Sequence, residues 1–329
     1  MTSNTASTPE KLIPLYRRYP SLKKIPRVSI IQFPTPVKEL KQVNRLLGGM
    51  NLWVKRDDLT TSKYGGNKPR KFEFVSAHAL KKKKTRILTM GGTGTNHGLA
   101  CTILAREFGL KTSLFLTNQP LTHLVRENLL CDHHFGAQLY YTKTALFTNW
   151  KLLFKRISSK LNYYLCIGAS NPLGTIGFVN AGLELADQIE AGLLSEPDKI
   201  FVALGSMGMA VGLAIGLELA GLKTKLIGVA VTPKSYNSKN KIMKLAKQTN
   251  RILHKADPTI PYVAPRIFDR LSVDRSFFGG EYGRWTHEGI AAMKIFTTKD
   301  PGYQLEPVYT AKVFSALIAY CQENPKAKS

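Results

Sequence analysis

The sequence predicts an α/β fold with mostly parallel strands, and three observations lead to this class. Two segments, residues 86–116 and 199–231, each read as an apolar strand, a glycine-rich loop, a helix and a second strand. The 329 residues, 43% of them hydrophobic, are enough for a substantial core and for two domains. The chain contains no internal repeat and no apolar run long enough to cross a bilayer.

The first chemically informative segment is residues 65–71, which read Gly-Gly-Asn-Lys-Pro-Arg-Lys. Positive charge from Arg70 and Lys71, together with partial burial, predicts a lowered pKa for Lys68. A lysine that is neutral near pH 7 is a nucleophile and forms a Schiff base with an aldehyde. The alternative is a solvated basic turn, which this segment by itself does not exclude.

Residues 86–116 predict the first strand–loop–helix–strand unit. Its strand, helix and second strand are expected at Arg86–Met90, Leu99–Phe108 and Leu110–Leu116. The loop at 91–98 carries Thr95, Asn96 and His97 beside many backbone donors. Such a loop suits a substrate carboxylate, and an amide side chain suits a ring hydroxyl.

Residues 199–231 predict a phosphate site. The expected strand, helix and second strand are Lys199–Leu204, Met209–Ala220 and Lys225–Val231. The loop at 204–212 reads Leu-Gly-Ser-Met-Gly-Met-Ala-Val-Gly. A strand, a glycine turn and a helix N-terminus direct backbone N–H groups and the positive end of the helix dipole at an anion. A lysine that binds an aldehyde, combined with a phosphate site, describes pyridoxal phosphate.

A dinucleotide site is the alternative for both glycine loops. The spacing in residues 205–212 is G-x-x-G-x-x-x-G, which differs from G-x-G-x-x-G. The strand that follows ends in Thr232–Lys234, and Asn118 and Gln119 follow the strand after the other loop. Neither place has the carboxylate that would bind a ribose hydroxyl. A single phosphate therefore fits better than a nicotinamide dinucleotide, and a nicotinamide-dependent oxidoreductase is disfavoured.

Motifs in one order along the chain resemble a known family. They are Phe33–Pro36, Val54–Leu59, Gly65–Glu73, Thr95–His97, Gly168–Gly174, the loop after Leu204, Glu281–Gly283 and Pro307–Lys312. From about residue 27 to 320, the chain is similar to the D-cysteine desulfhydrase and 1-aminocyclopropane-1-carboxylate (ACC) deaminase group of fold-type II pyridoxal-phosphate enzymes. The resemblance implies a homodimer with a tryptophan synthase β-like fold of two three-layer α/β domains with twisted, mostly parallel sheets. The smaller domain, residues 71–180, would be inserted in the larger, 1–70 and 181–329, and would end near a helix expected to start around Phe178.

The resemblance also implies roles for individual residues. Lys68 would form the Schiff base with pyridoxal phosphate and then act as the acid–base group at the substrate α-carbon. Asn96 would contact the ring hydroxyl of the cofactor, and Thr310 its pyridine nitrogen. The phosphate would be held by Gly205, Ser206, Met207, Gly208 and Met209. The substrate would contact Thr95, Asn96, His97, Tyr282 and Tyr309, of which Thr95, Tyr282 and Tyr309 are also predicted to be catalytic.

Four positions depart from the family pattern. Gly94 and Thr95 stand where glutamine and serine are usual, Met209 replaces a threonine of the phosphate loop, and Ala311 replaces a glycine. Thr95 adds a methyl group that stiffens its side chain, and Gly94 removes a side chain that would touch the substrate. We expect the cofactor to bind and the substrate or activity to be altered. A binding or regulatory protein that has lost turnover is the alternative.

Thr310 favours one of the two activities that name the family. Deaminase members place a carboxylate there, whereas desulfhydrase members place a hydroxyl. A hydroxyl does not fully protonate the pyridine nitrogen, which weakens the electron sink and suits elimination. The prediction is β-elimination from a small D-amino acid, with D-cysteine giving pyruvate, ammonia and sulfide. Deamination of ACC is the alternative.

Composition limits the partners and the location. The net charge of +25, from 47 basic and 22 acidic residues, is scattered and predicts a solvated basic surface without a specific nucleic-acid site. The cysteines form no C-x-x-C pair, and the side chains of Cys131–His134 would point to different sides of a helix, so neither a disulfide nor a metal site is expected. Residues 1–26 lack the apolar region of a secretory signal, which leaves the cytoplasm as the expected location.

Overall fold

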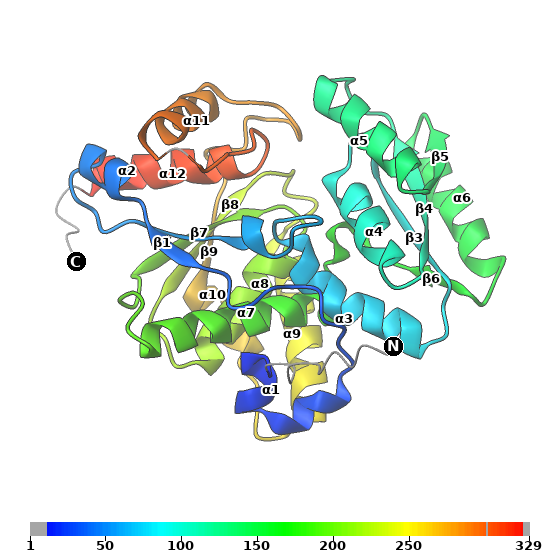
Figure 1. The fold of residues 1–329 in the computed structure, drawn as a ribbon, viewed down its shortest axis with the longest axis horizontal. Helices are drawn as coiled ribbons and strands as arrows, with labels where there is room; N and C mark the ends of the chain where they lie inside the picture. The colour runs from blue at the N-terminus through cyan, green and yellow to red at the C-terminus, as the bar shows by residue number, and fades with distance from the viewer. Residues whose placement is uncertain (1–11, 301, 325–329) are drawn as a thin grey trace, which may run out of the picture.

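The computed structural model describes residues 12–300 and 302–324, which fold around two parallel sheets (Figure 1). The strands are β1 (Val37–Glu39), β2 (Trp53–Lys55), β3 (Arg86–Gly92), β4 (Lys111–Thr117), β5 (Gln138–Thr142), β6 (Asn162–Tyr164), β7 (Lys199–Leu204), β8 (Lys225–Ala230) and β9 (Leu271–Asp274). The α-helices are α1 (Pro14–Arg18), α2 (Lys41–Leu46), α3 (Lys68–Lys81), α4 (Asn96–Arg106), α5 (His123–His134), α6 (Ala145–Ile157), α7 (Pro172–Glu190), α8 (Gly208–Leu219), α9 (Lys239–Ala256), α10 (Ile267–Arg270), α11 (His287–Lys299) and α12 (Thr310–Glu323). The predicted α/β class is confirmed.

The sheet of four parallel strands has the order β5-β4-β3-β6. Parallel neighbours require crossover connections, which α4, α5 and α6 supply. Successive residues of β3 point to opposite faces. Ile87 packs in a cluster with residues of α3 and α4, whereas Leu88 packs with Phe115 and with Leu152 of α6. The sheet is therefore buried on both faces, as is typical of parallel sheets.

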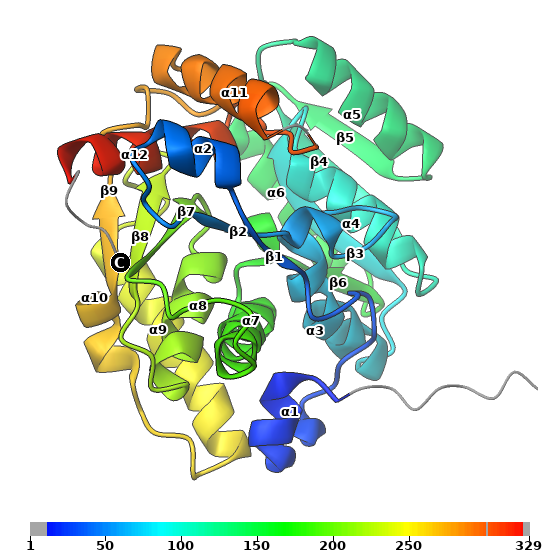
Figure 2. The same cartoon turned by 60° about the vertical axis from the view of Figure 1, so that its left-hand side comes forward.

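The sheet of three parallel strands has the order β7-β8-β9, and α8 follows β7 directly. Helix α7 packs along α8, as Figure 2 shows. The two helices approach closely at a pair of glycines, because a Cβ added to Gly182 would lie 2.9 Å from the Cα of Gly216. The hydrophobic core that packs against this sheet is the largest among the described residues and includes residues of α7, α8 and α9.

Helix α3 connects the two sheets. Phe74 packs in the larger core, whereas Phe72 and Val75 pack in the core of the smaller sheet. The expected domain boundary at residue 71 falls inside this helix, and the division into domains stays a prediction.

Most element boundaries lie within three residues of those predicted, and β7 has the predicted bounds. The expectation of a helix starting near Phe178 is wrong, since α7 begins at Pro172, more than a turn earlier. The Oδ1 atom of Asn171 accepts a hydrogen bond of 2.8 Å from the N–H of Gly174, and proline suits the first helical position. Within the described residues, no helix is long and apolar enough to cross a membrane.

Candidate active site

Four helices begin at residues that the sequence assigned to the site. Helix α3 begins at Lys68, α4 at Asn96, α8 at Gly208 and α12 at Thr310. The helices α4 and α8 follow the carboxyl ends of the parallel strands β3 and β7, where ligands of open α/β sheets bind. Helix N-termini carry unpaired N–H groups and a partial positive charge, which favours an anionic ligand.

Lys68 has the lowered pKa that a nucleophilic amine needs. Its Nζ atom donates a hydrogen bond of 2.8 Å to Oδ1 of Asn67. Burial lowers the pKa of Lys68 from 10.5 to about 8. The expected contribution from the charges of Arg70 and Lys71 is wrong, because burial is the cause of the shift. Arg70 forms ion pairs with Asp57 and Glu184, and the pKa of Lys71 is itself well below its ordinary value.

A buried ionic network fixes the start of α3 against α7. The guanidinium of Arg70 is fully buried and donates hydrogen bonds of 2.7 Å to Asp57 and 2.9 Å to Glu184. The ammonium of Lys55 also pairs with Glu184. Burial by itself would raise the pKa of Glu184, but the charges and hydrogen bonds of Arg70 and Lys55 outweigh it and lower the pKa to about 2. Because Arg70 is two residues after Lys68, the network holds that lysine in place.

The loop between β7 and α8 forms a cradle for an anion. Ser170 Oγ donates a hydrogen bond of 2.8 Å to Ser206 Oγ. It accepts hydrogen bonds of 2.9 Å from Lys71 Nζ and 3.1 Å from the N–H of Gly208. Met207, just before α8, has a φ of 70°, and the first turn of α8 contains no acidic residue. The amine of Lys71, two hydroxyls and a helix N-terminus therefore meet at one point.

Two glycines make this cradle possible. A Cβ on Gly168 would lie 2.1 Å from Ser206 Oγ, and one on Gly208 would lie 2.6 Å from Ser170 Oγ and 3.0 Å from Lys71 Nζ. Burial and the charge of Lys68 place the pKa of Lys71 well below its ordinary value. A bound dianion would offset both effects and favour the charged form of Lys71. The residues present thus fit the phosphate of pyridoxal phosphate.

The predicted substrate loop is held by residues from other elements. Asn128 of α5 donates hydrogen bonds of 2.9 Å to Oδ1 of Asn96 and of 2.9 Å to the carbonyl of Gly94. The hydroxyl of Tyr64 donates to the carbonyl of Asn96 at 2.9 Å. Thr95 Oγ1 accepts from the N–H of Gly98 at 3.3 Å and so caps α4. Because Oδ1 of Asn96 is an acceptor here, its amide nitrogen is the group suited to a ring hydroxyl.

His97 lies inside the protein on α4. Its Nε2 atom is 2.9 Å from Oγ1 of Thr89. Burial, and then the charges of Lys68 and Lys71, hold the pKa of His97 well below its ordinary value. The ring is therefore neutral and stabilises the strand–helix junction, and its predicted contact with substrate stays a prediction.

The two predicted tyrosines meet through their hydroxyls. The oxygen atoms of Tyr282 and Tyr309 lie 2.6 Å apart. A Cβ built on Gly205 would lie 3.8 Å from Cε1 of Tyr309, which places this ring beside the phosphate loop. Burial raises the pKa of both phenols, so each retains its proton near neutral pH. The pair can therefore donate a proton but cannot readily accept one.

The other two predicted cofactor contacts have partners within the protein. Thr310 Oγ1 accepts a hydrogen bond of 2.6 Å from the N–H of Glu306 and donates one of 3.2 Å to its carbonyl. Met209 Sδ lies 4.0 Å from Nδ2 of Asn67 and so links the phosphate loop to the lysine segment. The role of Thr310 at the pyridine nitrogen stays a prediction.

Four residues of the site were not predicted from the sequence as cofactor or substrate contacts: Lys71, Ser170, Tyr64 and Asn128. Two of them had a detectable signal. Lys71 follows Lys68 by three residues at the start of a helix, a spacing that puts both amines on one face. Ser170 lies in the motif at 168–174, which is one of the motifs that resemble the family, but no contact was predicted for it. Tyr64 and Asn128 reach the site only through the tertiary fold.

Comparison with known proteins agrees with this geometry. The model of a family described as pyridoxal-phosphate dependent enzyme matches residues 28–329. A putative 1-aminocyclopropane-1-carboxylate deaminase of Pyrococcus furiosus is 33% identical over 90% of this chain and 87% of its own length. A D-cysteine desulfhydrase of Klebsiella pneumoniae is 31% identical over 91% and 89%. The crystal structure of an ACC deaminase homologue matches with a TM-score of 0.79 and 27% identity, covering 96% of this chain and 92% of that one.

Proposed function

The chain belongs to the family of pyridoxal-phosphate dependent enzymes, and on this basis we propose that it is a lyase that eliminates the β-substituent of a small D-amino acid. D-Cysteine is the first candidate substrate. The proposal is supported by the contacts around the loop between β7 and α8. Lys71, three residues after the lysine with a pKa of about 8, is hydrogen-bonded to Ser170 of the anion cradle, and Tyr309 of the tyrosine pair lies beside Gly205.

Bound at this site, pyridoxal phosphate supplies an aldehyde for covalent attachment and a conjugated ring that stabilises negative charge on the carbon beside the amine. Lys71, Ser170, Ser206 and the N–H of Gly208 hold the phosphate, as their mutual hydrogen bonds support. The amide nitrogen of Asn96 binds the ring hydroxyl, and Asn128 fixes its orientation.

Lys68 moves the proton at the substrate α-carbon. With a pKa of about 8, a useful fraction of its Nζ atoms is neutral at physiological pH and accepts this proton. The ion pairs of Arg70 with Asp57 and Glu184 keep the start of α3, and hence the amine, in a fixed position.

The tyrosine pair protonates the leaving group. Elimination breaks the Cβ–S bond of D-cysteine, and the sulfur departs with the bonding electron pair. One hydroxyl of the pair donates its proton to that sulfur, while the 2.6 Å contact lets the other hydroxyl stabilise the phenolate that forms. With one water molecule consumed, the products are pyruvate, ammonia and hydrogen sulfide.

ACC deamination is the second candidate. Identity to relatives does not separate the two, because the values are 33% for the putative deaminase and 31% for a desulfhydrase. Thr310 favours elimination of a β-substituent, since the deaminases that this chain resembles place a carboxylate at that position.

The test is product analysis of the purified holoenzyme with D-cysteine, L-cysteine and ACC. We expect pyruvate and sulfide from D-cysteine, and a visible absorption band of the cofactor that shifts when this substrate is added. Lys68→Ala should lose the band and the turnover, while Lys81→Ala, which changes an exposed residue at the other end of α3, should keep both. Formation of 2-oxobutyrate from ACC without sulfide from D-cysteine would identify a deaminase, and an unchanged band with every substrate would indicate a binding protein.

Assembly and location belong to the same proposal. A homodimer is expected from the family resemblance, and light scattering of the holoenzyme measures its mass. All four cysteines are free, which supports a reducing compartment such as the cytoplasm.

A further inference from the structure

Helix α6 (Ala145–Ile157) turns an apolar face toward solvent. Its inner face packs on the four-stranded sheet, where Leu152 and Thr148 are buried. Figure 1 shows α6 on the outer side of that sheet. The outward side chains, with their exposed fractions, are Phe147 (63%), Trp150 (52%), Leu153 (46%), Phe154 (63%) and Ile157 (71%). We call these five side chains the α6 face. A helix on the surface of a soluble domain normally places polar residues there.

The helical spacing explains why these residues form one stripe. Phe147, Trp150, Phe154 and Ile157 follow one another at intervals of three and four residues. Because Leu152 and Thr148 occupy the opposite side, the stripe cannot be buried against this sheet. A face of five large apolar side chains, four of them at least half exposed, marks an interaction surface.

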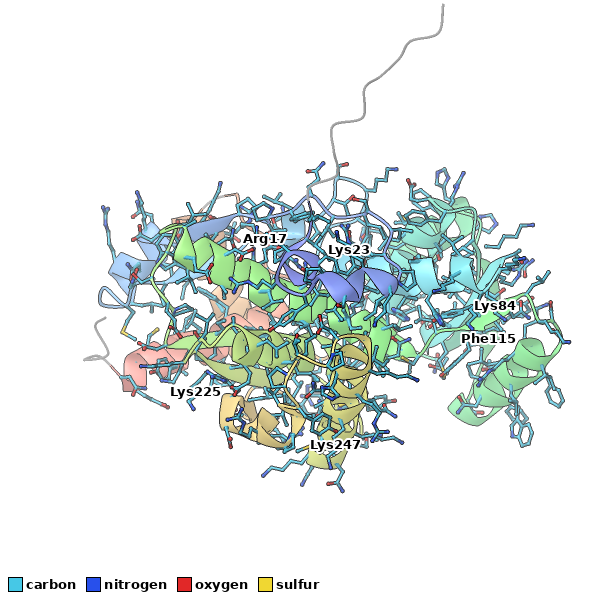
Figure 3. All side chains as sticks on the ribbon, turned by 90° about the horizontal axis from the view of Figure 1, so that it is seen from below. Arg17, Lys23, Lys84, Phe115, Lys225 and Lys247 are labelled. Carbon is cyan, nitrogen blue, oxygen red and sulfur yellow. The ribbon has the colours of Figure 1, made fainter. Side chains whose placement is uncertain are left out.

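Cations flank the α6 face on both sides. On the helix, Lys151 lies to one side of the stripe and Arg156 to the other, and both are exposed. The sequence from 133 to 183 contains no acidic residue. Lys84, whose Nζ donates to the carbonyl of Lys160, adds positive charge at the same end of the molecule (Figure 3). The face is therefore apolar at its centre, basic at its edges and free of neighbouring acids along the chain.

We propose that the α6 face binds the surface of a membrane that contains anionic lipids. Aromatic and aliphatic side chains of an amphipathic helix insert between head groups, while lysine and arginine at its edges contact lipid phosphates. The observed pattern fits this partner on both counts. The expectation of a merely solvated basic surface is incomplete for this helix, because it does not account for the apolar stripe.

Other partners fit less well. A second copy of the chain would bring its own Lys151 and Arg156 close to those of the first, and like charges repel. A nucleic acid would meet the cations and the rings of the face, but Leu153 and Ile157 offer it neither a ring for stacking nor a hydrogen bond to a base. An anionic membrane satisfies both the apolar and the basic parts.

The experiment is co-sedimentation of the full-length holoenzyme with vesicles of phosphatidylcholine alone and of phosphatidylcholine mixed with phosphatidylserine. We expect binding only to the mixed vesicles. Trp150→Ser and Phe154→Ser should each weaken binding about tenfold, from the loss of apolar burial. Lys151→Gln and Arg156→Gln should each weaken it about fivefold. The cofactor absorption band of each variant reports that it is folded.

Matched controls test the location of the effect. Lys244→Gln with Lys247→Gln removes two exposed cations from α9, and Figure 3 shows Lys247 away from Lys84. Trp285→Ser removes an indole that is 58% exposed. Both controls should bind like the unaltered protein. Equal loss in the α9 control would overturn the proposal in favour of net charge alone. Equal binding to neutral vesicles would also overturn the proposal. A lower molecular mass of Trp150→Ser in light scattering would overturn it in favour of a second copy of the chain. Binding to an oligonucleotide that is lost in Trp150→Ser would overturn it in favour of a nucleic acid.

Discussion

The hydroxyl oxygens of Tyr282 and Tyr309 lie 2.6 Å apart, although the two residues are separated by 27 positions in the chain. Tyr309 is directly followed by α12, and its ring lies beside the phosphate loop at Gly205. The contact joins two residues that were predicted separately from the sequence into one hydrogen-bonded pair. It therefore makes a specific prediction about the leaving group.

We expect Tyr282→Phe and Tyr309→Phe each to lower kcat for D-cysteine about hundredfold, in the range typical of a lost general acid. The double variant should be no slower than the slower single one, because the two residues act as a unit. With β-chloro-D-alanine, whose chloride leaves without a proton, the same variants should lose less than about threefold. Tyr262→Phe, at an exposed position, serves as the control. An equal loss with both substrates would show that the pair positions the substrate instead of donating a proton.

A feature of the fold or the site could be predicted from the sequence where the residues that form it lie close together in the chain. The glycine loops after β3 and β7 were predictable because each is one continuous strand–loop–helix segment. The hydrogen bond between Lys71 and Ser170 joins residues 99 positions apart and depends on the packing of α3 against α7. Likewise, the cations of α6 are visible in the sequence, but only the burial of Leu152 shows which face of that helix is left outside.

Lys71→Met should weaken pyridoxal phosphate binding by about ten- to hundredfold, because a charge-assisted hydrogen bond to a phosphate contributes about 1.5–3 kcal/mol. Titration of the apoprotein, followed by the visible band, measures the dissociation constant. Lys81→Met changes an exposed lysine at the end of the same helix and should bind like the unaltered protein. An unchanged dissociation constant in Lys71→Met would place the phosphate elsewhere.

The pKa of Lys68 predicts how fast the apoprotein takes up pyridoxal phosphate. Only the neutral amine reacts, so with a pKa of about 8 the rate should rise about fivefold from pH 7 to 8 and less than twofold from pH 8 to 9. Stopped-flow absorbance measures this rate. A lysine with the ordinary pKa of 10.5 would instead gain about tenfold in each step, and that result would contradict the burial of the amine.

Glu184→Gln should destabilise the protein by about 3 kcal/mol, because it leaves the buried guanidinium of Arg70 with a single carboxylate partner. Glu190→Gln on the same helix breaks only a partly exposed pair with Arg18 and should cost less than about 1 kcal/mol. Urea unfolding measures both.

The pKa of Glu184 is about 2 in the folded protein and 4.5 ordinarily, so the stability that it contributes is complete above pH 4.5 and is lost as the pH falls toward 2. The Gln variant should lack this part of the acid sensitivity.

The pKa of Asp132, which lies one turn after Asn128 on α5, predicts the opposite dependence of stability on pH. Its side chain is fully buried on α5, and its Oδ1 accepts a hydrogen bond of 2.8 Å from Thr102. Burial raises the pKa of Asp132 from 3.8 to about 7. Between these values the folded state keeps a proton that the unfolded state releases, so stability falls by about 1.4 kcal/mol for each unit that the pH rises.

Asp132→Asn stays neutral and should remove this decline, so that the free energy of unfolding in urea differs less between pH 5 and pH 8 than in the unaltered protein. Glu127→Gln, at an exposed position of the same helix, should leave the decline intact. If the two variants behave alike, Asp132 is ionised in the folded protein, and its burial does not raise its pKa.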